Sequence, residues 1–418
     1  MFKMQALASA VMCGSLAWSA LTRADTVTDW NEITLTAVTA ARPGPQGMLD
    51  VALVHIAVHD AVQAIEKRFE PYHFELPGAK GSRSAAAAAA AYTVLSSIYP
   101  TQATTLGATY HTYLADKGLT DDPGLIVGER AAQSLLPLRR TTPASTPPFV
   151  GGEDIGMWRP TESFIGNPPA PLSFSPMVTP WLADVDPFTL TSPRRFRADP
   201  PPALTSERYR RDYEEVKAMG ADANSMRTPQ QTDLAHFYND NFFAQWNRAL
   251  RGVAHQRVHR IGDSARLFAL ANMASADALI AAWDSKRHYS LWRPLTAIRE
   301  GDNDGHPLTM GDPAWRPLIN TPNYPDYTSG ANVLVGAMTR TLALFFGSDE
   351  TPFEVTSLSP LAVQKTRMYA RFSDASRDVV DARVYLGIHF RFADTAARRQ
   401  GIRVAEHVVD HFLAPCTR

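Results

Sequence analysis

The stretch that decides the interpretation of this chain is Tyr-Pro-Asp-Tyr-Thr-Ser-Gly-Ala-Asn-Val, residues 324–333. A turn leads into Ser329-Gly330, and apolar residues at helical spacing follow. Because Ser caps helix starts and Gly helix ends, we predict a helix over Ala331–Phe346 that stops at Gly347. The free N–H groups and positive dipole at such a helix start bind phosphate-like anions. Taken alone, Ser-Gly more often marks an ordinary helix cap than an anion site.

A second cluster lies before this stretch, in Lys-Arg-His-Tyr-Ser-Leu-Trp-Arg-Pro, residues 286–294. Lys286 and Arg293 are seven residues apart, about two helical turns, so we predict that both project from one helix face. Two cations on a face that should be packed, beside Trp292, need an anion. The alternative is a pair of solvated surface charges.

A third cluster follows, in residues 382–392, and contains Arg383 and His389. Either residue alone would more often be structural than catalytic. The three clusters together, in this order along the chain, favour one oxyanion site.

Composition excludes some partners but does not identify the function. The chain has 418 residues, enough for one large domain or two ordinary ones, and 45% are apolar, enough for a substantial core. Lys and Arg number 41 against 42 Asp and Glu, which gives no support for a nucleic acid or an acidic membrane as partner. Bound anions would therefore be held locally by clustered cations.

The N-terminus has the pattern of a secretory signal. Lys3 precedes an apolar and small-residue run over Ala6–Leu21, and Thr22-Arg23-Ala24 offers a cleavage site. We therefore predict a signal peptide over residues 1–24 and a periplasmic or secreted protein; the alternative is a buried N-terminal helix. Cys416 would then be the only cysteine of the mature chain, so no internal disulfide is expected. No later segment is apolar for about 20 residues, so no membrane span is expected.

Helical periodicity dominates the chain, and the predicted fold class is all-α, built from helical bundles. We divide the chain into an N-terminal helical region (25–136), a Pro-rich connecting segment (137–205) and a C-terminal helical bundle (206–418), together one compact unit. The connecting segment is too rich in Pro for regular elements and too aromatic for a disordered linker, so we predict an ordered surface connection. The predicted helices are Met48–Ile65, Ser84–Tyr99, Pro123–Leu136, Tyr209–Met219, one from Thr228 towards Arg251, Ser264–Trp283, His288–Ile298, Ala331–Phe346, Val379–Tyr385 and Thr395–Phe412.

The three clusters resemble the signature of the vanadium-dependent haloperoxidase and type 2 phosphatidic acid phosphatase superfamily. The matching pattern is Lys, six residues, Arg-Pro, then Ser-Gly, then Arg, five residues, His. Similarity to the soluble bacterial haloperoxidase-like branch also covers His55–Val62, the segments around Trp181 and Phe188, and Asp277–Trp283. The resemblance therefore extends over most of the mature chain.

The resemblance implies a role for each matching residue. Lys286, Arg293 and Arg383 would neutralise the oxyanion, while Ser329 and the Gly330 N–H would hydrogen-bond to it. His389 would provide the nitrogen that bonds to vanadium, or to phosphorus in a phosphatase. The implied cofactor is vanadate, and phosphate would fit the same site. A weaker carry-over is Asp240, which would pair with Arg383 and hold it in place.

Two positions depart from the family pattern. Ala331 stands where the family usually has a His that handles a proton, and general acid help is typically worth ~10²–10⁴-fold in rate. The acid that often follows four residues after the ligand His is replaced by Ala393, with Asp394 one residue later. His288 or Tyr327 could act as substitute donors, although packing is the more common role for His288.

The leading functional hypothesis is an exported haloperoxidase-like enzyme that oxidises halide, with bromide or iodide favoured, using hydrogen peroxide. Its substrates would be hydrogen peroxide, a halide and a small organic molecule, and related soluble members often form homodimers. Ala331 would weaken or alter turnover. The alternatives are an acid phosphatase with a phospho-His389 intermediate and a non-catalytic oxyanion-binding protein. A metal site at His55 and His59 lacks an evident third ligand.

Overall fold

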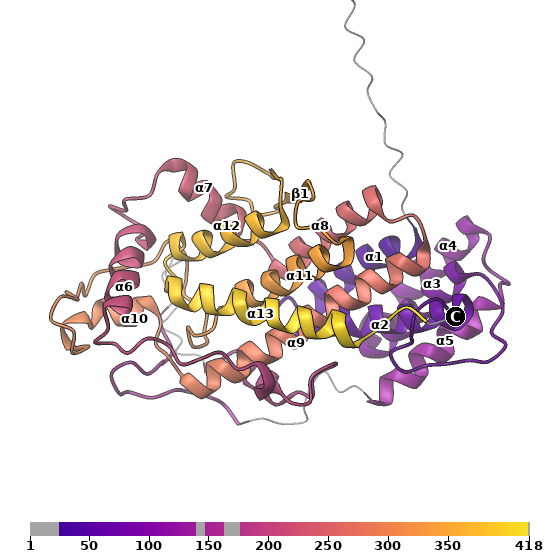
Figure 1. The fold of residues 1–418 in the computed structure, drawn as a ribbon, viewed down its shortest axis with the longest axis horizontal. Coiled ribbons are helices and arrows are strands. Elements are labelled where there is room, and N and C mark those ends of the chain that lie inside the picture. Colours follow the sequence, from indigo (N-terminus) through magenta and orange to yellow (C-terminus); the bar gives the residue numbers. More distant parts are fainter. Residues whose placement is uncertain (1–24, 139–146, 163–175, 417–418) are drawn as a thin grey trace, which may run out of the picture.

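The computed structural model describes residues 25–138, 147–162 and 176–416. The predicted signal peptide, residues 1–24, lies outside them. The described part is mostly helical, as predicted (Figure 1). Its α-helices are α1 (Thr26–Ala41), α2 (Gly47–Glu66), α3 (Arg83–Ile98), α4 (Ala103–Lys117), α5 (Gly124–Leu135), α6 (Glu207–Gly220), α7 (Pro229–Phe237), α8 (Phe242–Arg257), α9 (Ile261–Tyr289), α10 (Pro294–Arg299), α11 (Gly330–Phe346), α12 (Phe372–Tyr385) and α13 (Arg391–His411). Short 3₁₀ turns are η1 (Pro100–Gln102), η2 (Leu136–Leu138), η3 (Pro180–Asp184), η4 (Pro193–Phe196) and η5 (Gly301–Asn303).

Helix α9 lies at the centre of the molecule and packs against α2, α11 and α13 (Figure 1). It is buried from Leu267 to Lys286, which is why its sequence is apolar on all sides rather than on one stripe. Helices α2 and α9 are long and apolar enough to cross a membrane, but 94% of each apolar window is buried inside the protein. Both are therefore core helices in this fold.

The N-terminal helices α1–α5 gather at one end of α9, and α6, α7 and α10 lie at the other (Figure 1). Close approach in the N-terminal group depends on small residues. A Cβ at Gly128 of α5 would lie 2.2 Å from the carbonyl oxygen of Ala86 in the Ala-rich helix α3. Any larger residue at Gly128 would push these two helices apart.

The described parts of the Pro-rich segment are ordered against α9. The buried Asp277 carboxylate accepts hydrogen bonds from the backbone N–H groups of Phe188 and Thr189, both at 2.7 Å. Near the end of α9, Arg197 forms a bidentate ion pair with Asp284 at 2.6 and 2.8 Å. Carboxylates of α9 thus replace the backbone partners that regular structure would give this segment.

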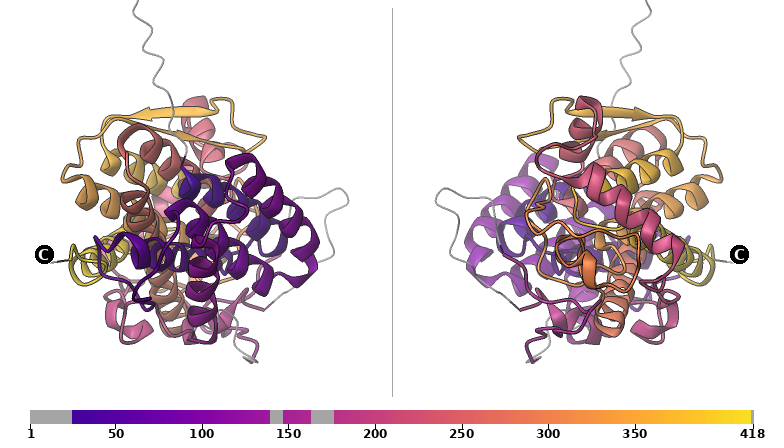
Figure 2. Two further views of the ribbon diagram at one scale, coloured as in Figure 1. Left: turned by 90° about the vertical axis from the view of Figure 1, so that its right-hand side faces the viewer. Right: turned by 90° about the vertical axis from the view of Figure 1, so that its left-hand side faces the viewer.

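Several local predictions differ from the structure. The helix predicted over His288–Ile298 is interrupted, since α9 ends at Tyr289 and α10 begins at Pro294, and the helix predicted over Val379–Tyr385 begins earlier, at Phe372. The helix predicted from Thr228 towards Arg251 is two helices, because the chain breaks after Phe237 and the Asn241 side chain caps the start of α8. Helices α1 and α4 were not predicted. The strands β1 (Phe353–Thr356) and β2 (Thr366–Tyr369) form a small antiparallel hairpin at the edge of the molecule (Figure 2).

Candidate oxyanion site

Lys286 and Arg293 do not share a helix face, contrary to the prediction. Helix α9 ends at Tyr289, Ser290 is left-handed with φ 45°, and Arg293 is the N-cap of α10. The two side chains still meet, because both reach the loop before α11. Lys286 Nζ donates to the Pro325 and Asp326 carbonyls at 2.6 and 3.2 Å.

Tyr324 lies beside both cations. Its carbonyl accepts from Arg293 Nε at 2.8 Å, and its ring centroid lies 4.7 Å from Lys286 Nζ and 4.8 Å from Arg293 Cζ. The aromatic face attracts the two buried charges. The loop over residues 324–326 is thus held in place by its contacts with Lys286 and Arg293.

His389 lies in the same cluster, between a cation and an acid. Arg293 Nη1 donates to the Ile388 carbonyl at 2.6 Å and lies 3.2 Å from His389 Nε2. On the other side, His389 Nδ1 lies 2.6 Å from Oδ1 of Asp326. All three side chains are buried, with 1% exposure or less.

Arg383 and Ser329 border this cluster. Arg383 is at the end of α12, where Nη1 donates to the Tyr238 carbonyl at 3.3 Å, and its charge contributes to a lowered pKa at His389. Ser329 is the N-cap of α11, as predicted, and Gly330 is the first helical residue. A Cβ at Gly330 would come within 3.0 Å of the Trp283 ring, so glycine lets α11 begin against α9.

A second acid, Asp394, lies at the start of α13 beside Ser329. Its Oδ1 accepts from Asn332 Nδ2 at 2.7 Å, and the Ser329 amide donates to the Ala393 carbonyl at 3.4 Å. Asp326 and Asp394 were not predicted as site residues. Asp326 lies inside the quoted stretch. The sequence feature that could have identified it as a site residue is an acid placed between aromatic residues.

Asp240 does not pair with Arg383. Its carboxylate forms an ion pair with Arg248 of α8 and accepts from the Leu358 backbone N–H at 2.8 Å. The helix break at 238–241 explains the difference, because it turns Asp240 towards α8 and the hairpin. Asp240 therefore does not contact the cluster, although its neighbour Tyr238 does.

Burial controls protonation in the cluster. It lowers the pKa of Lys286 and of His389 far below their ordinary values, and the neighbouring Arg293 charge lowers both further. His389 is therefore neutral at pH 7. Burial also lowers the pKa of Arg293 and Arg383, but a guanidinium stays charged in proteins.

The two carboxyl groups shift in the opposite direction. Burial raises the pKa of Asp326 to about 7, against the opposing effect of the Arg293 and Lys286 charges. Burial raises the pKa of Asp394 well above its ordinary value, while the Ser329 hydroxyl and the Asn332 amide oppose the shift. Asp394 is thus a buried acid that retains a proton to unusually high pH.

Donors suited to an oxyanion are left over in the cluster. Among the described residues, Arg293 Nη2 and Arg383 Nε are buried and have no hydrogen-bond partner. Such unpaired charged donors are costly unless a ligand uses them. The residues present therefore fit a tetrahedral oxyanion such as vanadate or phosphate. The Oδ2 atoms of Asp326 and Asp394 adjoin these donors and also lack a partner, so the fit requires that at least one of the two carboxyl groups is protonated.

The other proton donors that the sequence offered point elsewhere. Tyr327 is buried, and its hydroxyl donates to the Asp199 carbonyl at 2.6 Å. His288 is exposed and packs on Tyr289. His55 and His59 bond through Nε2 to Asn31 and to the Glu70 carbonyl, at 2.8 and 3.0 Å.

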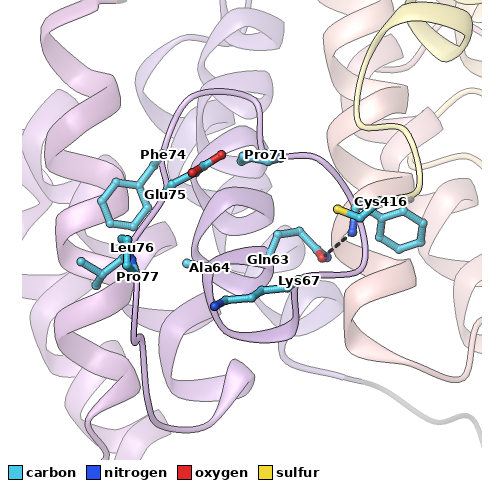
Figure 3. Close-up of a pocket in the computed structure, with 10 residues that line it drawn as sticks. Gln63, Ala64, Lys67, Pro71, Phe74, Glu75, Leu76, Pro77 and Cys416 are labelled. Atoms are coloured by element: carbon cyan, nitrogen blue, oxygen red, sulfur yellow. Dashed lines mark hydrogen bonds between the residues drawn. The ribbon is translucent and has the colours of Figure 1, made fainter. Parts of the chain in front are cut away.

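One pocket adjoins the cluster. It has a volume of about 320 Å³, and Tyr324 forms part of its wall together with Thr161, Glu162, Val178 and residues 320–323. A different pocket of about 290 Å³ lies at the C-terminal end of α2 and is lined by apolar residues together with Gln63, Lys67, Glu75 and Cys416 (Figure 3). That second pocket contains none of the predicted site residues.

Sequence comparison shows what the chain is similar to. Residues 266–417 match the model of the VCPO second helical-bundle domain, a range that contains every predicted site residue except Asp240. The chain is 24% identical to vanadium chloroperoxidase of Curvularia inaequalis over 83% of its length and 74% of that protein. In these comparisons the chain is similar to vanadium haloperoxidases.

Solved structures agree in fold with this vanadium haloperoxidase-like protein. A bacterial vanadium-dependent iodoperoxidase superposes with a TM-score of 0.77 at 21% identity, covering 93% of this chain and 97% of that one. A holo-type bacterial vanadium-dependent chloroperoxidase gives a TM-score of 0.72 at 17% identity, with the same coverage. The predicted resemblance to vanadium haloperoxidases and the predicted fold class are confirmed, and the chain is homologous to peroxidase enzymes.

Proposed function

We propose that this protein is a vanadate-dependent haloperoxidase that oxidises bromide or iodide with hydrogen peroxide, and that it is exported. The observation that carries the proposal is the buried cluster of Lys286, Arg293 and Arg383 around His389, with guanidinium N–H groups left unpaired. Export rests on the signal pattern of the first 24 residues. Homology to vanadium haloperoxidases supports the reaction class.

Each residue of the cluster has a role in this proposal. Lys286, Arg293 and Arg383 would hold vanadate by charge, Ser329 and the Gly330 N–H by hydrogen bonds, and His389 Nε2 would be its ligand. When bound, vanadate would supply Lewis-acid activation of hydrogen peroxide. Cations placed in advance in a buried site stabilise developing negative charge without reorganisation.

The reaction also needs a proton. Hydrogen peroxide, a halide ion and one proton give hypohalous acid and water, so each turnover consumes one proton. Ala331 cannot provide it, and we propose that Asp394 does. Its carboxyl is buried beside Ser329 and Asn332 and keeps its proton to high pH, since burial raises its pKa.

The pocket at Tyr324 is the proposed approach for peroxide, halide and a small organic substrate. Polar side chains such as Thr161, Thr321 and Asn323 line it, and Tyr324 separates it from Lys286 and Arg293.

Phosphoryl transfer is the second candidate function. A neutral His389 whose Nδ1 is held by a carboxylate resembles an oriented nucleophile, which a phosphatase with a phospho-His389 intermediate requires. A non-catalytic oxyanion-binding protein is the third candidate. Such a protein needs no acid/base residue, so Ala331 would not impair its function.

One paired assay separates the candidates. Purified mature protein is assayed for bromide and iodide oxidation with peroxide and orthovanadate, and for phosphatase activity without vanadate. We expect peroxidase activity that Arg293→Ala abolishes and that Arg340→Ala, at a half-exposed ion pair with Glu406, leaves intact. Phosphatase activity alone would favour the second candidate, and a vanadate-induced rise in melting temperature without either activity would favour the third.

A further inference from the structure

A third pocket, of about 450 Å³, is lined by residues of α11, α12 and α13. These three helices lie side by side (Figure 1). Each of them contributes one arginine to the lining: Arg340, Arg377 and Arg398. The acidic lining residues are Asp349 and Glu406. No residue of this pocket belongs to the oxyanion cluster or to the other two pockets, so it is a separate feature of the molecule.

Both acids of this pocket already have partners. Glu406 Oε1 lies 3.0 Å from Arg340 Nε and 2.8 Å from Arg340 Nη2, in an ion pair. The Asp349 carboxylate accepts from the backbone N–H and the hydroxyl of Ser373 at 2.9 and 2.6 Å, near the start of α12. Each acid is therefore held by a group other than Arg398.

Arg398 is the cation of the pocket that lacks an acidic partner. Its Nε donates to Ser376 Oγ at 2.7 Å, and its two Nη groups have no hydrogen-bond or ion-pair partner among the described residues. Arg377, by contrast, forms an ion pair with Asp374 at 2.6 Å. Burial lowers the pKa of Arg398, and the charge of Arg377 lowers it further, although a guanidinium stays charged in proteins. A partly buried charge without a counter-charge is costly, so an anion at Arg398 would stabilise the pocket.

The α13 side of the pocket has a charged end and an apolar middle. Arg398, Ile402 and Glu406 are spaced four residues apart, so they lie on one face of α13. At a rise of 1.5 Å per residue, Glu406 lies about 12 Å along the helix from Arg398, and Ile402 lies halfway between them. Ala343 of α11 is the other apolar lining residue. The pocket therefore combines an unpaired guanidinium with an apolar surface next to it.

We propose that this pocket binds a small organic carboxylate, with its carboxylate group against the Nη groups of Arg398 and its apolar body on Ile402 and Ala343. A guanidinium can donate two parallel hydrogen bonds to a planar carboxylate, which favours this anion over a point-like one. An inorganic anion would leave the apolar lining uncovered. A volume of about 450 Å³ is in the range of small-molecule sites. The proposal does not rest on the proposed function.

The direct test is saturation-transfer NMR of hexanoate with the mature protein, without vanadate or phosphate and at low ionic strength, where salt screens the charges least. We expect hexanoate to bind about tenfold more tightly than acetate, because burial of two further methylene groups gives about that factor. Hexylammonium, which has the same apolar body and the opposite charge, should bind more weakly than hexanoate. No hexanoate binding, or binding no tighter than that of acetate or hexylammonium, would overturn the proposal, and this result needs no variant to fold.

Three variants locate the bound hexanoate. Arg398→Gln removes the unpaired charge, and Arg399→Gln removes the charge of the exposed neighbour that does not line the pocket. We expect Arg398→Gln to weaken hexanoate binding about tenfold or more, since charge-assisted hydrogen bonds are lost, and Arg399→Gln and Arg293→Ala to leave it nearly unchanged. Equal weakening by Arg398→Gln and Arg399→Gln would show that only net charge matters. Loss in Arg293→Ala with retention in Arg398→Gln would place hexanoate in the oxyanion cluster, and either result would overturn the proposal.

Discussion

Asp394 and Ala331 together define how the site handles protons. Ala331 follows Ser329-Gly330 and is 6% exposed, within the main apolar core. Asp394 reaches the same helix start from α13 and contacts Asn332. In the proposed function, Asp394 provides from another helix the acid/base group that residue 331 lacks. The sequence places this acid one residue after the position where the family often has one.

The pH dependence of stability tests the state of Asp394. Burial raises the pKa of Asp394 in the folded protein above its value of about 3.9 in the unfolded chain. The protonated acid therefore contributes stability that is present in full below the unfolded pKa and is lost as the pH rises through the folded pKa. Asp394→Asn cannot ionise. We expect the melting temperature of the variant, relative to unmutated protein, to rise between about pH 5 and pH 8 in calorimetry without oxyanions. A constant difference would show that Asp394 ionises normally in the folded protein.

Ala331→His tests the space beside the helix start. Ala331 is buried, so a larger side chain should overpack the site and lower the free energy of unfolding by about 1–3 kcal/mol in urea titration. Ala331→Ser, with one added atom, should cost less. Unchanged stability together with faster halide oxidation in Ala331→His would contradict the role given to Asp394.

At the scale of elements, the turn before His389 depends on one glycine. Gly387 has φ 77°, and a Cβ there would lie 2.4 Å from the Gly220 carbonyl oxygen and 2.8 Å from Cβ of Pro317. This turn connects α12, which carries Arg383, to the segment that carries His389. A residue that displaced it would move the ligand histidine relative to Arg293 and Asp326.

Gly387→Ala has a matched control in Gly347→Ala. Gly347 has φ 71° but open space around it, so its substitution should cost only the left-handed strain of about 1–2 kcal/mol. Gly387→Ala should cost more, since backbone and Pro317 atoms must also shift, and should weaken orthovanadate binding. Urea unfolding and vanadate titration measure both effects. Equal costs for the two variants would mean that the close packing at Gly387 is unimportant.

On the scale of the whole molecule, α9 links the N-terminal helices, the Pro-rich segment and the site. Buried Asn272 on α9 continues a polar chain through Asn247 and Asn31 to His55, while Asp277 holds residues 188–189. Lys286 lies at the far end of the same helix. The position of the site thus depends on packing along the full length of α9.

Asp277→Ala tests the attachment of the Pro-rich segment. The change leaves the N–H groups of Phe188 and Thr189 without their carboxylate, and an unsatisfied buried group costs about 1–3 kcal/mol. We expect faster hydrogen exchange in a peptide that covers these residues, measured by mass spectrometry. Leu279→Ala, a core change on the same helix, serves as control for general destabilisation. Identical exchange in both variants would contradict a specific attachment.

Periodicity and capping residues were enough to predict most helices, since these signals are local. The helix over Ala331–Phe346, stopped at Gly347, is confirmed within one residue. Junctions were not predictable in the same way: Ser290 has a left-handed backbone that ends α9 before Arg293, and its carbonyl accepts from the distant Trp158 N–H at 2.6 Å. Asp326, inside the quoted stretch, and Asp394, one residue after Ala393, meet the cluster through contacts between distant segments, so local patterns alone did not assign them to the site.

The central claim is that Lys286, Arg293, Arg383 and His389 form one oxyanion site with His389 Nε2 as the ligand atom. A crystal structure of the protein soaked with orthovanadate, using anomalous scattering from vanadium, tests it most directly. The account predicts one vanadium peak bonded to Nε2 of His389, with the three cations around its oxygens. A vanadium peak elsewhere, bonding through Nδ1, or no peak in crystals of folded protein at saturating vanadate would contradict it.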